Sequence, residues 1–391
     1  MSKTLLIAYC GLLLSVSAFS CDITLPAFWS MERDLAAPIE WVQAVVPVFL
    51  IAQGFGQLAF GPVSDRFGRR PVILAGLVLY IAGAGVAALA AGIGLVHVGR
   101  IAQGVGSACG IAVGRAVLRD VSHGPALAQA MALAMAIFAL GPICAPLLGY
   151  GLVALGGWRT IFLGMGLFGA ALLAATVGWF RETNPAPDRE ALQPRRLLQA
   201  LLRVLRHPQS RYFLTVAAIT QFGIVSFVAN APRFFKSAFA IDGFLFAALF
   251  AATGLGIVLG QLTNTRLIAL LGVLAATRVA AFVLLAVTAA VTLLSLAGAL
   301  PGVVFAGLMF IFNTSFLVVI ANSASLVIDP HREIAGFTSS VYGFVTQITA
   351  SALAVLTVPL FGGALLPWAL VMLLVTGSAF VALMAYRRAA V

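Results

Sequence analysis

The sequence predicts an all-α membrane protein with twelve transmembrane helices in two pseudo-symmetric six-helix bundles. Hydrophobic residues make up 62% of the 391 residues, charged residues only 9%, and the mean hydropathy is +1.09. A soluble domain carries roughly 25% charged residues. The apolar residues also form long runs along the whole chain, which leaves room for about twelve spans of roughly 20 residues each. This composition excludes water-soluble nucleic-acid binders, extracellular scaffolds and disordered proteins.

The individual spans are predicted from apolar runs bounded by glycine, proline and charged residues. The first run follows Lys3 and could imitate a signal peptide, but it lacks a clear small-residue cleavage pattern, so we assign it to the first helix. The spans of the first half are predicted at 5–29, 41–63, 71–92, 96–118, 127–151 and 158–180. Those of the second half are predicted at 210–236, 244–265, 272–297, 302–322, 333–360 and 363–386.

One long polar segment, 182–209, separates the two sets of spans. Its second half, from Leu197 to Leu205, is amphipathic and basic, so we expect it to lie along the inner headgroup surface. The segment divides the chain into an N-terminal bundle, 1–181, and a C-terminal bundle, 210–391. This plan is typical of transporters built from repeats, whose binding site lies near the middle of the membrane between the halves.

The net charge of +11, from 23 Lys and Arg against 12 Asp and Glu, is interpreted as a topology signal. Most basic residues, including Lys3 and the C-terminal Arg387 and Arg388, fall on the same side of the predicted spans. The positive-inside rule therefore places both termini in the cytoplasm. The exceptions on the outer side are Arg33, Arg100, Arg159, Arg233 and Lys236.

The cysteines and histidines do not indicate a metal or cofactor site. Cys10, Cys21, Cys109 and Cys144 all lie in apolar stretches and are expected to be buried packing residues. No Cys-x-x-Cys or His-x-x-x-His spacing occurs, so we expect no metal and no cofactor. The sequence also contains no paired acids, no Ser/His/Asp grouping and no phosphate loop, which argues against an enzyme.

The segment between the second and third spans combines turn residues with an acid among arginines. It reads GPVSDRFGRRP from Gly61 to Pro71. Gly61 permits a close approach of helices, and Gly68 permits a tight turn. Asp65 is placed to meet either a helix N-terminus or a basic partner from a neighbouring helix. We predict that this segment takes part in conformational switching.

The fourth and fifth spans carry two further patterns. Arg100 is either a snorkelling residue near the outer end or a buried cation held by carbonyl groups of the first or fifth span. The prolines of the fifth span remove backbone donors, so this helix is expected to be kinked and tightly packed. The switch residues predicted from these three segments are Gly61, Asp65, Arg66, Gly68, Arg69, Arg119, Asp120, Gly141, Pro142 and Pro146.

Asp22 is the only acid that the predicted spans place deep inside an apolar helix. A carboxyl group in a low-dielectric environment can exchange protons near neutral pH, and an acid within the membrane is by default a functional site. A structural alternative is an aspartate that hydrogen-bonds a hydroxyl or carbonyl group to stabilise a kink at Pro26. We predict that Asp22, together with Arg100, couples transport to protons.

These motifs resemble those of the major facilitator superfamily. Gly61-x-x-x-Asp65-Arg-x-Gly68-Arg-Arg is similar to its signature loop at every specified position, and the Arg100 segment resembles its helix 4 motif, which is associated with proton transfer. The stretch from Gly141 to Gly149 resembles the helix 5 motif of exporting members. Asp-x-x-Leu-Pro-Ala in the first span and Arg-Ala-x-x-Arg-Asp at the end of the fourth resemble the bicyclomycin-resistance (Bcr/CflA) branch of drug:proton antiporters.

The resemblance implies a monomeric, proton-coupled exporter of drugs or other small molecules in the bacterial cytoplasmic membrane, working by alternating access. Related exporters of broad specificity carry a second acid earlier in helix 1. Here those positions are Leu14 to Ser17, so a two-acid mechanism is not implied. One alternative is a dedicated exporter of an endogenous metabolite such as a siderophore, an amino-acid derivative or another anionic molecule. Another is a membrane sensor built on a transporter scaffold.

The expected substrate cavity is aromatic, contains one titratable acid and is otherwise mostly neutral, which favours neutral, apolar or weakly polar compounds. An anionic ligand would instead engage arginines of the spans. The residues predicted to contact the substrate are Asp22, Gln103, Arg115, Gln221, Asn230, Arg233, Asn322, Tyr342 and Gln347.

Overall fold

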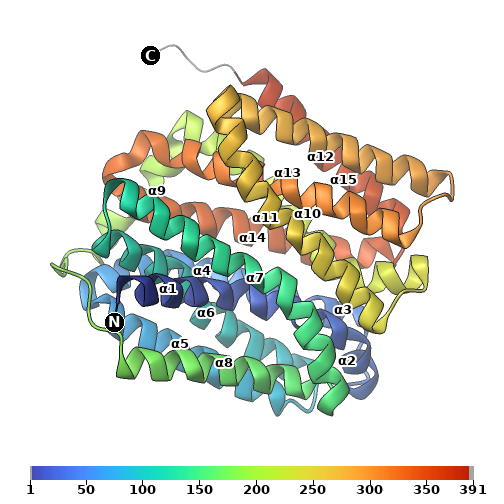
Figure 1. Ribbon diagram of the computed structural model, residues 1–391, viewed down its shortest axis with the longest axis horizontal. Coiled ribbons are helices and arrows are strands. Elements are labelled where there is room, and N and C mark those ends of the chain that lie inside the picture. Colours follow the sequence, from blue (N-terminus) through green and yellow to red (C-terminus); the bar gives the residue numbers. More distant parts are fainter. Residues whose placement is uncertain (1, 387–391) are drawn as a thin grey trace.

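A computed structural model describes residues 2–386, in which every regular element is a helix (Figure 1). The first half contains α1 (Lys3–Asp22), η1 (Leu25–Ala27), α2 (Phe28–Asp34), α3 (Ile39–Gln43), α4 (Val45–Phe67), α5 (Arg69–Ala88), α6 (Ile93–Val121), α7 (Gly124–Gly156) and α8 (Arg159–Gly178). After α9 (Pro194–Arg206), the second half contains α10 (Pro208–Phe239), α11 (Gly243–Leu271), α12 (Val273–Leu296), α13 (Gly302–Ile328), η2 (Asp329–Ile334), α14 (Ala335–Phe361) and α15 (Leu365–Ala385).

Eleven segments of the described chain are long and apolar enough to cross a membrane. One of them, Gly302–Phe361, is 60 residues long and contains both α13 and α14, separated by the 3₁₀ helix η2. It therefore supplies two crossings, which gives twelve in all. The predicted all-α fold class is confirmed.

The first two crossings are interrupted, which the predicted spans did not show. α1 ends at Asp22, and the chain continues through η1, which contains Pro26, before α2 begins. Proline cannot donate an amide hydrogen bond within a helix, which accounts for the break at this point. By contrast, α7 continues as one helix through both Pro142 and Pro146.

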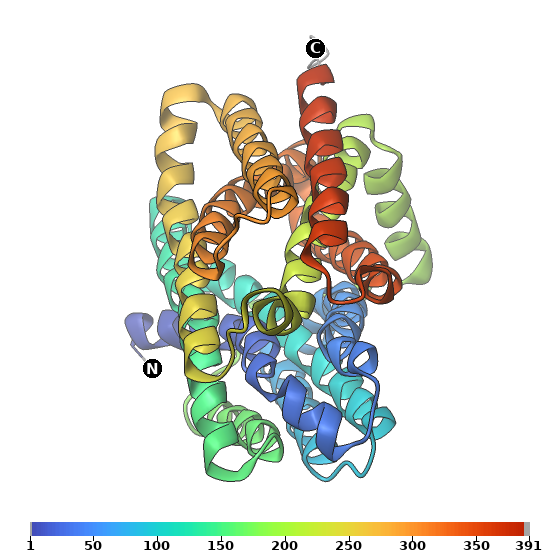
Figure 2. The same cartoon turned by 90° about the vertical axis from the view of Figure 1, so that its right-hand side faces the viewer.

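The transmembrane helices pack as two groups. α1 to α8 pack on one another, α10 to α15 do the same, and the groups meet chiefly where α4 contacts α14 and α7 contacts α11. Figure 1 and the end-on view of Figure 2 show the two groups facing each other across the middle of the molecule. We keep 1–181 and 210–391 as the proposed bundle boundaries.

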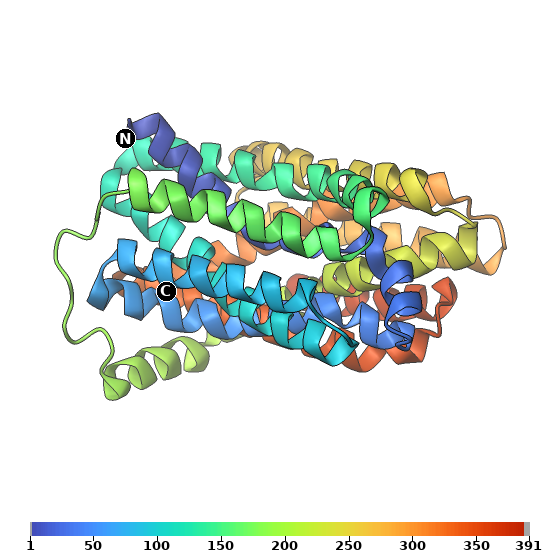
Figure 3. The same ribbon diagram turned by 90° about the horizontal axis from the view of Figure 1, so that it is seen from below.

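Both ends of the described chain lie at one end of the helix bundle, together with the linker and α9 (Figures 1 and 3). We call this end the linker end, and the opposite end, which carries α2 and α3, the far end. Arg387 and Arg388, which the charge pattern assigned to the cytoplasmic side, lie outside the described residues.

Three of the four cysteines are buried as predicted, but Cys144 is exposed on the outside of α7.

The packing of α7 on α1 is close. A Cβ atom at Gly141 would lie 3.3 Å from the Cβ of Ala18. The small residue therefore allows the two helix backbones to approach.

Candidate substrate cavity and switch loop

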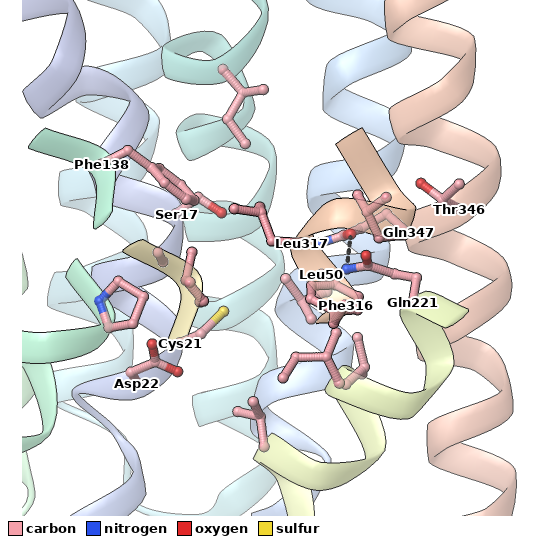
Figure 4. Close-up of a pocket in the computed structure, with 18 of the residues that line it drawn as sticks. Ser17, Cys21, Asp22, Leu50, Phe138, Gln221, Phe316, Leu317, Thr346 and Gln347 are labelled. Carbon is pink, nitrogen blue, oxygen red and sulfur yellow. Dashed lines mark hydrogen bonds between the residues drawn. The ribbon is translucent and has the colours of Figure 1, made fainter. Parts of the chain in front are cut away.

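A cavity of about 320 Å³ lies between the two groups of helices. α1, α4, α6 and α7 line it on one side, and α10, α11, α13 and α14 on the other. Its wall is mainly apolar, with a smaller number of polar groups among the hydrophobic side chains, as binding sites for small molecules usually have. Figure 4 shows part of this lining, including Leu50, Phe138, Phe316, Gln221 and Gln347.

Asp22 is the last residue of α1, and its carboxylate faces the cavity beside Cys21 (Figure 4). The residue is 7% exposed, and within the described residues its side chain has no hydrogen bond and no ion pair. The hydrogen bond at the helix break comes instead from the Thr24 hydroxyl group, which donates to the carbonyl of Cys21 at 2.7 Å. Among the described residues, Asp22 therefore makes no hydrogen bond of the kind that the structural alternative requires.

Arg100 is completely buried, so the snorkelling alternative is wrong. Its Nε donates to the carbonyl of Val45 at 3.2 Å, and Nη1 donates to Oε1 of Gln103 at 3.1 Å. The guanidinium also lies over the ring of Phe49, 4.2 Å from its centroid. The carbonyl group thus comes from α4 and not from the first or fifth span. Nη2 of Arg100 has no hydrogen-bond partner among the described residues, but the Arg100 side chain also interacts with the thiol of Cys21 on α1.

Five of the nine predicted substrate contacts line the cavity: Asp22, Arg115, Gln221, Tyr342 and Gln347. The other four lie outside this lining. Gln103 faces Arg100 and Met165 inside the first half. Asn230 and Arg233 contact the first half at the far end, as described below, and Asn322 is buried elsewhere in α13.

A chain of polar side chains that the sequence analysis missed crosses the cavity between the halves. Nε2 of Gln53 donates to the hydroxyl groups of Ser17 at 2.7 Å and Ser107 at 2.9 Å. Nε2 of Gln347 donates to Oε1 of Gln53 at 3.3 Å. Nε2 of Gln221 donates to Oε1 of Gln347, also at 3.3 Å (Figure 4). A glutamine at position 53, inside an apolar run, was the signal available in the sequence.

At the far end, polar contacts join the two halves directly. Nη1 of Arg233 forms an ion pair with Glu40 at 2.9 Å. Nε2 of Gln43 donates to Oδ1 of Asn230 at 3.0 Å and to the carbonyl of Ala229 at 3.1 Å. These contacts close the far end of the cavity.

Toward the linker end, two further cavities continue from the main one. The first, of about 200 Å³, shares Gln57, Ile111, Arg115 and Ser339 with it. The next, of about 260 Å³, adjoins the first at Arg119 and reaches α9. The cavities therefore continue toward the linker end, whereas polar contacts join the two halves at the far end.

The loop between α4 and α5 is organised around the buried guanidinium of Arg69. Its Nη1 forms an ion pair with Oδ1 of Asp65 at 2.5 Å, and its Nε pairs with Oδ2 of Asp120 at 2.9 Å. Asp65 thus meets a basic partner from the neighbouring helix, the second of the two predicted possibilities. Arg66 is exposed and its guanidinium lies over Phe67. Arg119 lines the adjoining cavities.

Glu182, for which the sequence analysis had no role, caps the N-terminus of α5. Its carboxylate accepts the backbone N–H groups of Arg69 at 2.8 Å and Arg70 at 3.0 Å, as well as those of Thr183 and Asn184. Partial burial acts to raise the pKa of this carboxyl group, but the four N–H donors outweigh it and lower the pKa. Gly68, with a φ of 96°, makes room for it, since a Cβ there would lie 2.6 Å from Oε2 of Glu182.

The family profile of the Major Facilitator Superfamily matches residues 10–354. The chain therefore belongs to this superfamily. It is a membrane transporter of small molecules and not an enzyme.

The chain is also similar to individual proteins, among them two relatives and one solved structure. It is 26% identical over 344 residues to the "Uncharacterized MFS-type transporter YdgK" of Bacillus subtilis, covering 87% of this chain and 85% of the relative. It is 26% identical over 264 residues to the "Bicyclomycin resistance protein homolog" of Haemophilus influenzae, covering 67% and 66%. The crystal structure of the human organic anion transporter MFSD10 matches with a TM-score of 0.71 at 20% identity, covering 95% and 98%. At 20% identity, this structural similarity establishes the fold alone.

Proposed function

We propose that this member of the Major Facilitator Superfamily is a proton-coupled exporter of drug-like small molecules that works by alternating access. The observation that carries the proposal is Asp22, an unpartnered carboxylate that faces an apolar cavity between the two halves. The similarity to a bicyclomycin resistance protein homologue supports a place in the drug-exporting branch.

We place the linker end in the cytoplasm of a bacterial cell, because most of the basic residues lie there and the positive-inside rule orients membrane proteins by such residues. The cavity then faces inward in this structure, since its far end is closed by the Arg233–Glu40 ion pair and the Gln43–Asn230 hydrogen bond. Export requires these contacts to break and a closure to form at the linker end.

In the proposed cycle, Asp22 takes a proton when the cavity opens to the outside and releases it when the cavity opens to the cytoplasm. An ionised carboxylate in an apolar wall is costly unless it is hydrated or paired. Protonation removes that cost and allows the halves to close around the cavity without substrate. Arg100 is the second proposed coupling residue, because within the described residues its buried guanidinium has no carboxylate partner and one nitrogen has no hydrogen bond.

Efflux from cells that express the protein tests the proposal. A panel of drug-like compounds is measured with and without a protonophore, for the parent protein and for Asp22→Asn. We expect uphill export that collapses with the protonophore and is abolished in the variant, while downhill exchange remains. Asp34→Asn, an acid beside Arg33 at the far end, is the matched control and should export normally. Unchanged uphill export by Asp22→Asn would refute the coupling role.

A dedicated metabolite exporter is the second candidate function. It shares the mechanism and differs only in the substrate. One observation favours it: Arg115, which could bind an anionic metabolite, lines the cavity. Transport of a natural metabolite in preference to every drug of the panel would decide for it.

A further inference from the structure

The main cavity has two charged residues in its lining, Asp22 and Arg115, and they lie far apart. Gly110 of α6 packs against the backbone of Leu13 of α1. Gly110 and Leu13 therefore lie at the same height along the axis of the bundle. From that level, Asp22 lies toward the far end and Arg115 toward the linker end. At about 1.5 Å per helical residue, their separation along the bundle is about 20 Å. The two side chains therefore do not form an ion pair.

Arg115 also has no other acidic partner within the described part of the chain. Its Nη1 contacts the hydroxyl group of Ser339 at 3.5 Å, which is long for a hydrogen bond. Asp65 and Asp120, two acids at the linker end, are both engaged by Arg69. A guanidinium has five N–H donors, so most of those of Arg115 remain available in a half-buried position. Such a cation within a membrane helix is expected to have a partner.

The charged side chains that line the cavities at Arg115 toward the linker end include a second arginine. The adjoining cavity of about 200 Å³ is lined by Arg115, Arg119 and Gln57, and none of its lining residues is acidic. Ser339 and Ser340 of α14 add two hydroxyl groups there. Arg119 follows Arg115 by about one helical turn, so both guanidinium groups raise the positive potential of the same space.

We infer that the exported molecules are amphipathic organic anions whose acidic group binds to Arg115. A planar guanidinium recognises a carboxylate, sulfonate or phosphate group by paired hydrogen bonds. The apolar body of the molecule would then extend toward Asp22 between Leu50, Phe138 and Phe316. The inference rests on the proposed function, which it deepens by naming the substrate class.

This arrangement separates the substrate charge from the proton site. The sequence favoured neutral compounds because the cavity was expected to contain one acid and otherwise mostly neutral groups. Arg115 adds a positive charge to the cavity lining, which favours an anionic substrate instead. Outward movement of one anion in exchange for one inward proton transfers two charges. Export should therefore slow more steeply when the membrane potential is dissipated than export of a neutral compound would.

Two fluorescent probes that share one aromatic skeleton test the inference. 8-Anilinonaphthalene-1-sulfonate is anionic, and N-phenyl-1-naphthylamine is its neutral counterpart. Binding to the full-length protein in lipid nanodiscs is measured, with empty nanodiscs as background. We expect the protein to bind the sulfonate about tenfold more tightly than the neutral probe. Arg115→Gln should remove that preference while leaving the affinity for the neutral probe within about twofold.

Two further variants keep the result interpretable. Arg115→Lys retains the charge but not the planar fork, so it should restore part of the preference. Arg203→Gln removes one positive charge from the exposed surface of α9, outside the main cavity, and should bind like the parent protein. Thermal unfolding of each variant identifies any that do not fold, in which case Arg115→Lys carries the comparison.

The outcomes separate this inference from the proposed function. Equal affinity of the parent protein for both probes, or an undiminished preference in Arg115→Gln, overturns the anion site. Proton-driven export combined with equal affinity leaves the proposed function standing and refutes the anion site alone. A preference that depends on Arg115, without proton-driven export, supports the anion site and refutes the coupling proposal.

Discussion

The two ends of the bundle are held together in different ways. At the far end, Arg233 and Glu40 join one half to the other across the closed cavity. At the linker end, Arg69 joins Asp65 and Asp120, all within the first half. Contacts between halves stabilise one conformation of the transporter, whereas contacts within a half keep that half rigid in every conformation. The ends should therefore respond differently to the loss of an arginine.

The largest expected loss of stability follows Arg69→Ala. The substitution leaves two carboxylates without their shared cation, and Asp120 is only 13% exposed. Breaking a buried ion pair by removing one partner costs about 3 kcal/mol or more. Denaturant or thermal unfolding in detergent should show this loss. Arg196→Ala, which breaks an exposed pair with Asp188 at the same end, should cost under about 1 kcal/mol. Equal losses in the two variants would contradict the buried network.

Gly68→Ala should have the next largest effect at the linker end. An alanine at a φ of 96° is strained, and its Cβ would displace the carboxylate of Glu182 from the N-terminus of α5. We expect a loss of about 2 kcal/mol, measured by the same unfolding assay. Gly85→Ala within α5 is the control, since a Cβ there meets nothing within 4 Å and the substitution should not destabilise the protein, with a gain of at most about 1 kcal/mol from the higher helix propensity of alanine.

At the far end, Arg233→Ala should cost only about 1 kcal/mol of stability, because the pair is partly exposed, with side chains 17% and 33% accessible. Its main effect should instead be a shift toward an outward-open cavity. In a variant that retains Cys21 as the sole cysteine, labelling by an impermeant maleimide added outside spheroplasts should increase.

The control for this shift is Arg33→Ala, whose exposed pair with Asp34 lies at the same end but within the first half. It should leave the labelling of Cys21 unchanged. The comparison between the two ends is wrong if Arg233→Ala unfolds the protein as strongly as Arg69→Ala or leaves the labelling where it was.

Glu182→Gln should have an effect on stability about as small as that of Arg233→Ala, but one that depends on pH. Because the folded protein lowers the pKa of Glu182, the ionised carboxylate stabilises the fold at pH values above its unfolded pKa of about 4.3. That contribution is lost as the pH falls through the lower pKa of the folded state. The parent protein should exceed the variant by about 1 kcal/mol at pH 7, and the difference should shrink below about pH 4. A difference independent of pH would exclude the charged cap.

Much of the candidate site could be inferred from residue type, and the remainder depended on which way each helix faces. Asp22 could be identified because an acid in a long apolar run is costly wherever the helix packs. Gln103 and Asn230 are also polar residues in apolar runs, yet both turn away from the cavity. Gln53 is a polar residue in an apolar run as well, but its residue type alone does not show that it faces the cavity and contacts Ser17 and Ser107.

The sequence by itself determined the twelve crossings and the acid within the first of them, because the cost of placing side chains in lipid is summed residue by residue along the chain. Tertiary structure alone decided the partners. Arg69, Arg100, Arg115 and Arg233 are all arginines at or within apolar helices. Arg69 neutralises two acids, and Arg100 is held by a carbonyl group of α4. Arg115 faces the cavity, and Arg233 joins the two halves at the far end. Apart from the local contacts of Arg69 with Asp65 and of Arg100 with Gln103, those roles depend on helix rotation and on residues at least 51 positions away, which no local pattern encodes.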